Sequence, residues 1–294
     1  MSKQLETELA KEQEHINQRL LHSVEAIPAP TRLKNSILYS IRAGGKRIRP
    51  ILMKWSCESF HGDTEKVYPA AIALEMIHTY SLIHDDLPAM DDDTYRRGQY
   101  TNHKMFDEAT AILAGDGLLT NSFQIIANSS IYSDKEKVFL IEKLSAFSGM
   151  SGMVGGQTLD MESEKRDITL RELEEIHHMK TGRLLSYAIQ AGSFLAGTDD
   201  KTLEVIDQFA GYAGLIFQIQ DDILDVVGDA KTLGKQIGKD AENDKNTYPK
   251  ILGLQGAIQQ KQQYVEKAKT CLSQIGLQST KLETFIDYIS DRNT

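Results

Sequence analysis

Apolar residues recur with a helical period along most of the chain. Residues 3–20 carry widely spaced leucines and one isoleucine among charged neighbours, which predicts an amphipathic helix that ends before Pro28 and Pro30. Residues 70–83 and 209–219 are apolar on nearly all sides, and each segment runs directly into aspartates. Helices of that kind lie inside a bundle. The pattern therefore predicts two buried helices that end in acidic side chains.

Local signals support an all-α bundle. Thr169 and Glu172 have the spacing of a capping box and precede a predicted helix that includes Leu184. No sustained alternation of β-branched residues bounded by turn signals occurs, so strands are expected to be scarce. Residues 228–247 are rich in glycine and lysine, and a loop of that length is more often functional than idle.

Composition is that of an ordinary globular enzyme. The chain has 294 residues, of which 40% are hydrophobic and 26% charged, and no linker divides it, so residues 1–294 are expected to form a single domain. The net charge of −9 argues against nonspecific binding to nucleic acid or anionic membranes. We expect no nucleic-acid partner.

The cysteine content and the hydropathy of the chain indicate its cellular compartment. Cys57 and Cys271 are too few for a disulfide framework, which favours a reducing compartment. No uncharged apolar run reaches about 18 residues, and the first residues lack the apolar region of a signal peptide. We expect a cytoplasmic protein without stable membrane insertion.

Two clusters of aspartates close the two buried helices. Carboxylates about 4 Å apart repel by roughly 4 kcal/mol at an effective dielectric near 20, so such crowding needs cations. Mg²⁺ prefers carboxylate oxygens and completes its shell with water and phosphate oxygens, which suggests a diphosphate site. The predicted metal ligands are Asp85, Asp86, Asp91, Asp221, Asp222 and Asp225.

The two clusters differ in geometry. Asp221 and Asp225 are four residues apart and share one helix face. Asp85 and Asp91 would point about 120° apart on a regular helix, but Pro88 cannot continue one, so a turn could bring them back to one side. Either cluster alone is more often a solvated acidic loop. Two clusters, each after a buried helix, favour the metal site.

Basic residues complement the acidic clusters. Lys46 and Arg49 follow a glycine pair, and Arg96 and Arg97 follow the first aspartates. Arginine pairs with phosphate oxygens through two hydrogen bonds and keeps its charge. A single basic residue is usually only surface charge, so the hypothesis depends on the set. Further candidates are Lys180, Lys235 and Lys245.

Ordered motifs carry a family resemblance over nearly the whole chain. They occupy residues 44–50 (Gly-Gly-Lys-Arg-Ile-Arg-Pro), 78–93, 96–98, 155–160, 180–182, 217–225, 233–235 and 240–249. In this order they resemble the trans-type prenyl diphosphate synthases, and within them the bacterial farnesyl diphosphate synthases. The resemblance implies an all-α isoprenoid-synthase bundle with a central active-site cavity, and a homodimer.

The same resemblance implies a role for each matching residue. The six aspartates would bind Mg²⁺, for which Mn²⁺ can substitute, bridging an allylic diphosphate. Residues that would hold the same diphosphate are Arg96, Lys180 and Lys235. The pocket for isopentenyl diphosphate would comprise Lys46, Arg49, His78 and Arg97. Thr181 and Gln218 would lie near the reacting carbons, and the loop that carries Lys235 and Lys245 would form a lid.

Two positions, His78 and Tyr80, each fit more than one role. A histidine in an apolar helix, such as His78, is more often a hydrogen-bonded core residue, but its motif match favours the pocket. In the family, an aromatic residue at the position of Tyr80 goes with fifteen-carbon products. Ideal-helix geometry places Ser81, rather than Tyr80, in line with Asp85, so spacing alone does not show which residue limits the chain length.

The expected reaction is Mg²⁺-dependent head-to-tail condensation of isopentenyl diphosphate with dimethylallyl or geranyl diphosphate to farnesyl diphosphate. A geranylgeranyl diphosphate synthase is the nearest alternative, and Tyr80 disfavours it. A terpene cyclase is disfavoured by the form of the second aspartate cluster and by the second-substrate pocket. A noncatalytic subunit of a prenyl synthase is disfavoured because both clusters are complete.

Overall fold

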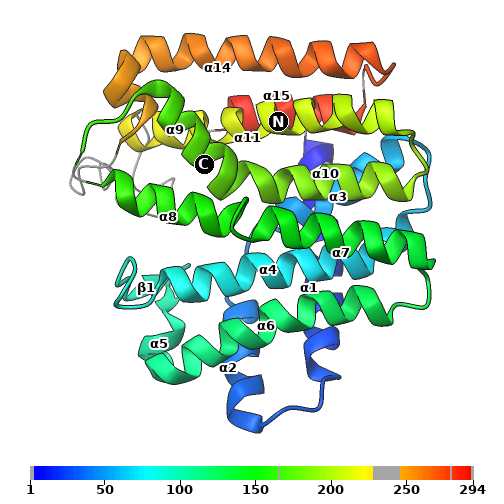
Figure 1. The fold of residues 1–294 in the computed structure, drawn as a ribbon, viewed down its shortest axis with the longest axis vertical. Helices are drawn as coiled ribbons and strands as arrows, with labels where there is room; N and C mark the ends of the chain where they lie inside the picture. Colours follow the sequence, from blue (N-terminus) through cyan, green and yellow to red (C-terminus); the bar gives the residue numbers. More distant parts are fainter. Residues whose placement is uncertain (1–2, 165, 228–245, 279, 293–294) are drawn as a thin grey trace. The chain divides into compact units, whose positions relative to one another are not determined.

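The computed structural model describes residues 3–164, 166–227, 246–278 and 280–292. Their contacts group into two compact units, which are described separately below. Unit 1 comprises Met1–Lys54 and Asp63–Glu142, and unit 2 comprises Trp55–Gly62 and Lys143–Thr294. Helices dominate the described part of both units (Figure 1), so the predicted all-α class is confirmed. The single-domain organisation stays a prediction.

Unit 1 is built around one buried helix. Its elements are α1 (Lys3–Glu25), α2 (Thr31–Arg42), the first part of α3 (Ile48–Ser59), the short 3₁₀ helix η1 (Thr64–Val67), α4 (Tyr68–Asp85), β1 (Tyr95–Arg96), β2 (Gln99–Tyr100), α5 (Asn102–Met105), α6 (Glu108–Asn128) and the first part of α7 (Asp134–Ser148). Helix α4 packs against α6, and α2 also contacts α6 (Figure 1).

Helix α4 is the buried helix that the sequence predicts. Pro69 lies in its first turn, where a missing amide costs no hydrogen bond. Residues 70–77 are buried without exception, so the helix is covered on all sides over two turns. Its last regular residue is Asp85, after which the amide of Asp86 still donates to the carbonyl of Leu82 at 3.2 Å.

The strands are scarce, as expected, and form one small sheet among the described residues. Strands β1 and β2 form an antiparallel hairpin in which Tyr95 pairs with Tyr100 and Arg96 with Gln99. The turn between them contains Arg97 and Gly98, both at positive φ. Two residues per strand are too few to leave an alternating pattern in the sequence.

Unit 2 contains the end of α3, the end of α7, and α8 (Met153–Ser163), α9 (Leu170–His177), the π-helix η2 (His178–Gly182), α10 (Arg183–Leu195), α11 (Asp200–Val227), α14 (Tyr248–Gln274) and α15 (Lys281–Asp291). Helix α11 packs between α10 and α14 and also contacts α15 (Figure 1). The predicted capping box of Thr169 and Glu172 is confirmed. The helix expected to include Leu184 is interrupted by a π turn, so this expectation holds only in part.

Large buried side chains form the core of unit 2. Tyr187, Phe209 and Phe285 come from three different helices, and each is exposed by at most 1%. Burial of such side chains supplies the main stabilisation of a helical bundle. Among the described residues, no helix is both long and apolar enough to cross a membrane.

Candidate active site

The chain reverses direction directly after α4. The amide of Asp91 donates a 2.9 Å hydrogen bond to the carbonyl of Asp85, and the amide of Asp92 donates to the carbonyl of Leu87 at 3.1 Å. The turn predicted at Pro88 is therefore confirmed. It returns the backbone of Asp91 to that of Asp85, which a continued helix would not do.

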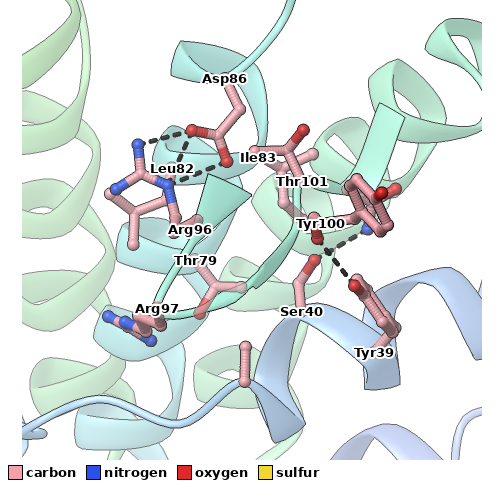
Figure 2. A pocket seen from close by; sticks show the side chains of 12 residues that line it. Tyr39, Ser40, Thr79, Leu82, Ile83, Asp86, Arg96, Arg97, Tyr100 and Thr101 are labelled. Carbon is pink, nitrogen blue, oxygen red and sulfur yellow. Dashed lines mark hydrogen bonds and ion pairs between the residues drawn. The ribbon is translucent and has the colours of Figure 1, made fainter. Parts of the chain in front are cut away.

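The buried Asp86 forms an ion pair with the half-buried Arg96 of the hairpin. Nε of Arg96 donates to both carboxylate oxygens of Asp86, at 2.7 and 2.9 Å, and Nη2 lies 2.5 Å from Oδ1 (Figure 2). Burial raises the pKa of Asp86, and the hydrogen bond and charge of Arg96 oppose that rise. Both oxygens thus serve to orient Arg96, and the metal-ligand role of Asp86 stays a prediction.

Predicted isopentenyl diphosphate ligands meet in the same unit. Burial lowers the pKa of His78 well below 6.5, and the positive charges of Arg49 and Arg97 lower it further. His78 is therefore a neutral imidazole in the field of two guanidinium groups. The Nε atom of Arg49 is buried without a hydrogen-bond partner. Such a group is suited to an anionic ligand. Lys46 is exposed in the loop between α2 and α3.

The glycine pair has a steric reason. Gly44 and Gly45 have φ of 83° and 140°, values that residues with a side chain rarely adopt. A Cβ atom on Gly45 would lie 2.7 Å from the guanidinium of Arg97. The glycine pair thus lets the backbone come close to Arg97, a predicted ligand of isopentenyl diphosphate. Gln13 of α1 also holds this loop, because its Nε2 donates to the carbonyl of Gly45 at 2.6 Å.

Arg47 and Glu75 form an ion pair at the candidate site that the sequence did not predict. Arg47 donates to Oε1 of Glu75 at 2.6 Å, to Oδ1 of Asn17 at 2.8 Å and to the carbonyl of Ile41 at 2.9 Å. The backbone of Arg47 has φ of 51°, a strained conformation for this residue. Glu75 is thus the buried counter-charge of the basic cluster, and its position as a lone acid in an apolar helix was the available signal.

The residues assigned to chain length lie one turn before Asp85. Tyr80 is 5% exposed, and its ring packs edge-on against His84 with centroids 5.7 Å apart. Burial raises the pKa of Tyr80 to about 12, with a further contribution from the charge of Asp85. Ser81 is half-buried, and its hydroxyl donates to the carbonyl of His78 at 3.0 Å. The chain-length roles of both residues stay predictions.

Figure 2 shows a small pocket between α2, α4 and the hairpin of unit 1. Arg96 faces Asp86, whereas the guanidinium of Arg97 points away from that pair. The hydroxyl of Tyr39 donates to the carbonyl of Tyr100 at 2.7 Å, which ties α2 to the hairpin. The hairpin therefore presents its two arginines in different directions.

In unit 2, Lys180 lies in the π turn. Its Nζ donates to Oδ2 of Asp160 at 2.6 Å. A Cβ atom on Gly156 would lie 2.2 Å from the backbone nitrogen of Lys180, and one on Gly214 would lie 2.8 Å from Gly182. Helices α8 and α11 thus pack against the turn through glycines. Single π turns are frequent at functional sites, and this one presents Lys180 and Thr181 side by side.

A chain of hydrogen bonds runs from the π turn to the second acidic cluster. Thr181 donates to Gln218 at 3.3 Å, and Gln218 donates to Oδ1 of Asp222 at 3.3 Å. The backbone amide of Tyr248 donates to Oδ2 of Asp222 at 2.9 Å. Asp222 is 3% exposed. It therefore connects α11 to the start of α14, and its metal-ligand role stays a prediction.

The remaining aspartates of this cluster are more accessible. Asp221 and Asp225 are both half-buried and lie one turn apart on α11, as predicted. Nη2 of Arg292 lies 2.5 Å from Oδ1 of Asp221. Arg292 was not identified from the sequence.

A pocket of about 120 Å³ adjoins these groups in unit 2. His177 lines it, is stacked on Tyr248 with centroids 5.7 Å apart, and has a buried Nε2 without a hydrogen-bond partner. Burial lowers the pKa of His177 to about 4. The other lining residues are Asp160, Ser163, Glu164, Lys180, Thr181, Gln218, Asp222, Asn246 and Thr247. Lys235 and Lys245 lie outside the described residues, and so does most of the predicted lid.

The acidic residues fit magnesium bound together with a phosphate ligand. Among the described residues, no three or more His, Cys, Asp or Glu side chains converge to hold an ion by themselves. Mg²⁺ usually takes only one or two carboxylates, with waters and substrate phosphates completing its shell. Asp85 and Asp91, joined by their turn, and Asp221 and Asp225, one helical turn apart, match that mode.

Comparison with protein families identifies the relationship. The polyprenyl synthetase model matches residues 30–284. The chain belongs to this family. It is 44% identical over 295 residues to the farnesyl diphosphate synthase of Bacillus subtilis, with 100% of both chains covered. It is 48% identical over 278 residues to that of Micrococcus luteus, covering 95% of this chain and 94% of the relative. It is also 46% identical to a geranylgeranyl diphosphate synthase of Cyanophora paradoxa, covering 90% and 89%.

Solved structures give the same family. An FPP/GFPP synthase from Zymomonas mobilis superposes with a TM-score of 0.83 at 34% identity and covers 96% of this chain and 99% of that chain. A geranyltransferase from Helicobacter pylori, solved with magnesium and isoprenyl diphosphate, superposes with a TM-score of 0.80 at 30% identity and covers 95% of each chain. The chain thus shares its all-α fold with prenyl synthases.

Proposed function

We propose that the protein joins isopentenyl diphosphate head to tail to dimethylallyl or geranyl diphosphate and makes (2E,6E)-farnesyl diphosphate. The observation that carries the proposal is the basic cluster of unit 1: Nε of Arg49 is buried without a hydrogen-bond partner, and the positive charges of Arg49 and Arg97 both act on His78. A cluster of this kind suits a second diphosphate, which a terpene cyclase does not need. Relatives named farnesyl diphosphate synthases, similar over nearly the full length, support the same reaction.

The first step is ionisation of the allylic substrate. Its C–O bond breaks with both electrons leaving on the diphosphate, and the carbon side becomes a resonance-stabilised cation. Arg96, held by Asp86, and Lys180 stabilise the negative charge that grows on the leaving group. Bound magnesium would add positive charge at the same oxygens, held by Asp85, Asp91, Asp221 and Asp225 with Asp86 and Asp222 as further candidates.

The second step is condensation. The diphosphate of isopentenyl diphosphate is held by Arg49, His78, Arg97 and the exposed Lys46. Its double bond then lies next to the cation and attacks it, so the encounter of two molecules becomes effectively unimolecular. The new tertiary cation then loses a proton to the released diphosphate, which gives the double bond of the product. Thr181 and Gln218, joined at 3.3 Å, are assigned to the neighbourhood of the reacting carbons. No protein general base is required.

Product length is assigned to α4. Tyr80 is bulky and buried, and we assign to it the limit at fifteen carbons, with Ser81 as the neighbouring position. The relative from Cyanophora paradoxa keeps geranylgeranyl diphosphate as the alternative product.

Several finer properties belong to the same proposal. We assign Mg²⁺ as the ion, with Mn²⁺ as a substitute because it takes the same oxygen ligands. We assign a homodimer, which the exposed Ile112 and Leu113 on α6 support. We assign a cytoplasmic location, which the two buried thiols Cys57 and Cys271 support.

The test is whether diphosphate release needs both substrates. The purified protein, with Mg²⁺ and geranyl diphosphate, should release inorganic diphosphate only when isopentenyl diphosphate is added. Equal release without isopentenyl diphosphate would indicate a cyclase or hydrolase. No release under either condition would indicate a noncatalytic subunit.

A further inference from the structure

Arg292 is anchored at the second acidic cluster by contacts on several sides. Its Nη2 donates to the carbonyl of Phe217 at 3.0 Å, and its Cζ lies 4.1 Å from the centroid of the Phe217 ring. The carbonyl of Arg292 accepts a 2.8 Å hydrogen bond from Nε2 of Gln220. The guanidinium is therefore held in place independently of any carboxylate.

The same guanidinium contacts Asp221. Nη2 lies 2.5 Å from Oδ1 of Asp221, and the exposed fractions of the two side chains are 8% for Arg292 and 31% for Asp221. Asp225, one helical turn further along α11, is half-buried. The basic group thus pairs with one of the two more accessible carboxylates of the cluster and leaves the other on the same helix face.

This pairing has a definite electrostatic consequence. A fixed positive charge within a few ångströms of a divalent ion repels it, and partial burial limits the screening by water and salt. The pair also supplies Asp221 with a hydrogen-bonded partner when no ion is bound. An incoming ion must therefore either share Asp221 with Arg292 or displace it.

We propose that Arg292 is the resident counter-cation of Asp221 and weakens metal binding at this cluster until a diphosphate contributes its own negative charge. Arg292 is thus a positioning residue, which acts on the metal through Asp221. The inference rests on the proposed function, because it takes Asp221 as a metal ligand. Its consequence is that metal and diphosphate bind together rather than in sequence.

The experiment compares Mn²⁺ binding by the full-length wild type and Arg292→Gln, measured by electron paramagnetic resonance of free Mn²⁺. Without diphosphate, the variant should bind Mn²⁺ roughly tenfold more tightly, since one like charge has been removed. Arg292→Lys keeps the charge and should stay near the wild-type affinity. Lys269→Gln is the matched control: it removes one positive charge from an exposed ion pair between α14 and α15, 2.7 Å from Asp287, and should change nothing.

Thermal unfolding without metal shows whether each variant is folded. Arg292→Gln should still unfold cooperatively, and if it does not, Arg292→Met provides a second uncharged variant whose chain can cover the Phe217 ring. Equal or weaker Mn²⁺ binding by folded uncharged variants overturns this inference alone. If no protein binds Mn²⁺ even with inorganic diphosphate, the inference falls together with the proposed function.

Discussion

Nη1 of Arg47 donates a 2.6 Å hydrogen bond to Oε1 of Glu75, and the two side chains are only 1% and 3% exposed. The pair joins the loop after α2 to the middle of α4. Two predicted ligands of isopentenyl diphosphate follow closely along the chain: Arg49, in the first turn of α3, and His78, on α4. The pair therefore fixes the spacing of the basic cluster before any substrate binds.

Removing the carboxylate of this pair should destabilise the protein strongly. Glu75→Gln leaves Arg47 as a buried charge without a counter-charge, which costs about 3–5 kcal/mol of unfolding free energy. Urea unfolding measures the change. Glu65→Gln breaks the exposed pair with Arg19 and should cost at most about 1 kcal/mol. Similar losses of unfolding free energy in both variants would show that the buried pair stabilises the protein no more than the exposed pair does.

Two aspartates at the turn after α4, Asp85 and Asp92, should differ in their effect on turnover. Asp85→Asn should lower turnover by about 100-fold or more, because charge stabilisation at the leaving group is lost, while unfolding stays cooperative. Asp92→Asn is the matched change, since Asp92 is exposed, pairs only loosely with Lys104 at 3.6 Å, and Asn tolerates its positive φ. Steady-state kinetics compares them. Undiminished activity in Asp85→Asn would remove Asp85 from the metal site.

His177 should make stability depend on pH. Its pKa is about 4 in the folded protein and near 6.5 when unfolded, so between these values only the unfolded chain binds the proton. Stability should fall as the pH drops from 6.5 to 4, by up to about 3 kcal/mol from this residue.

The comparison for this prediction is His177→Gln. The difference in unfolding free energy between wild type and variant isolates His177 from other groups that titrate in the same range. That difference should shift in favour of the variant as the pH is lowered. A difference that is constant between pH 6.5 and 4 would contradict the assignment of a buried neutral imidazole.

The position of Tyr80 predicts a change of product. Tyr80→Ala should lengthen the main product beyond fifteen carbons, because it removes a buried ring one turn before Asp85. Chromatography of the dephosphorylated products measures the length. Ser148→Ala on α7, which removes only a buried hydroxyl bonded to the helix backbone, is the control. A fifteen-carbon product from Tyr80→Ala would assign the limit to another residue.

Periodicity was enough to predict the helical class and the buried helix α4. The pattern of 70–83 shows that every face of this helix is covered, and Pro88 shows that it cannot continue past the aspartates. The same pattern says which side chains are buried but not what they contact. It could not pair Glu75 with Arg47, since that pairing depends on a loop backbone with φ of 51° at Arg47.

Family motifs predicted most candidate site residues but not Arg292. Arg292 lies beyond the last motif, and its contact with Asp221 joins residues 71 positions apart. The π turn at Lys180 depends on close packing of glycines from α8 and α11, which a local pattern does not encode. The site was thus predictable as a set of residues, but not as a set of contacts.

The most direct test of the central claim is the identity of the product. The protein is incubated with isopentenyl diphosphate, either dimethylallyl or geranyl diphosphate, and Mg²⁺, and the dephosphorylated prenols are separated by chromatography. The account predicts the fifteen-carbon alcohol as the main species with either allylic substrate. A twenty-carbon alcohol would contradict the farnesyl assignment, and no elongated prenol at all would contradict the proposed reaction.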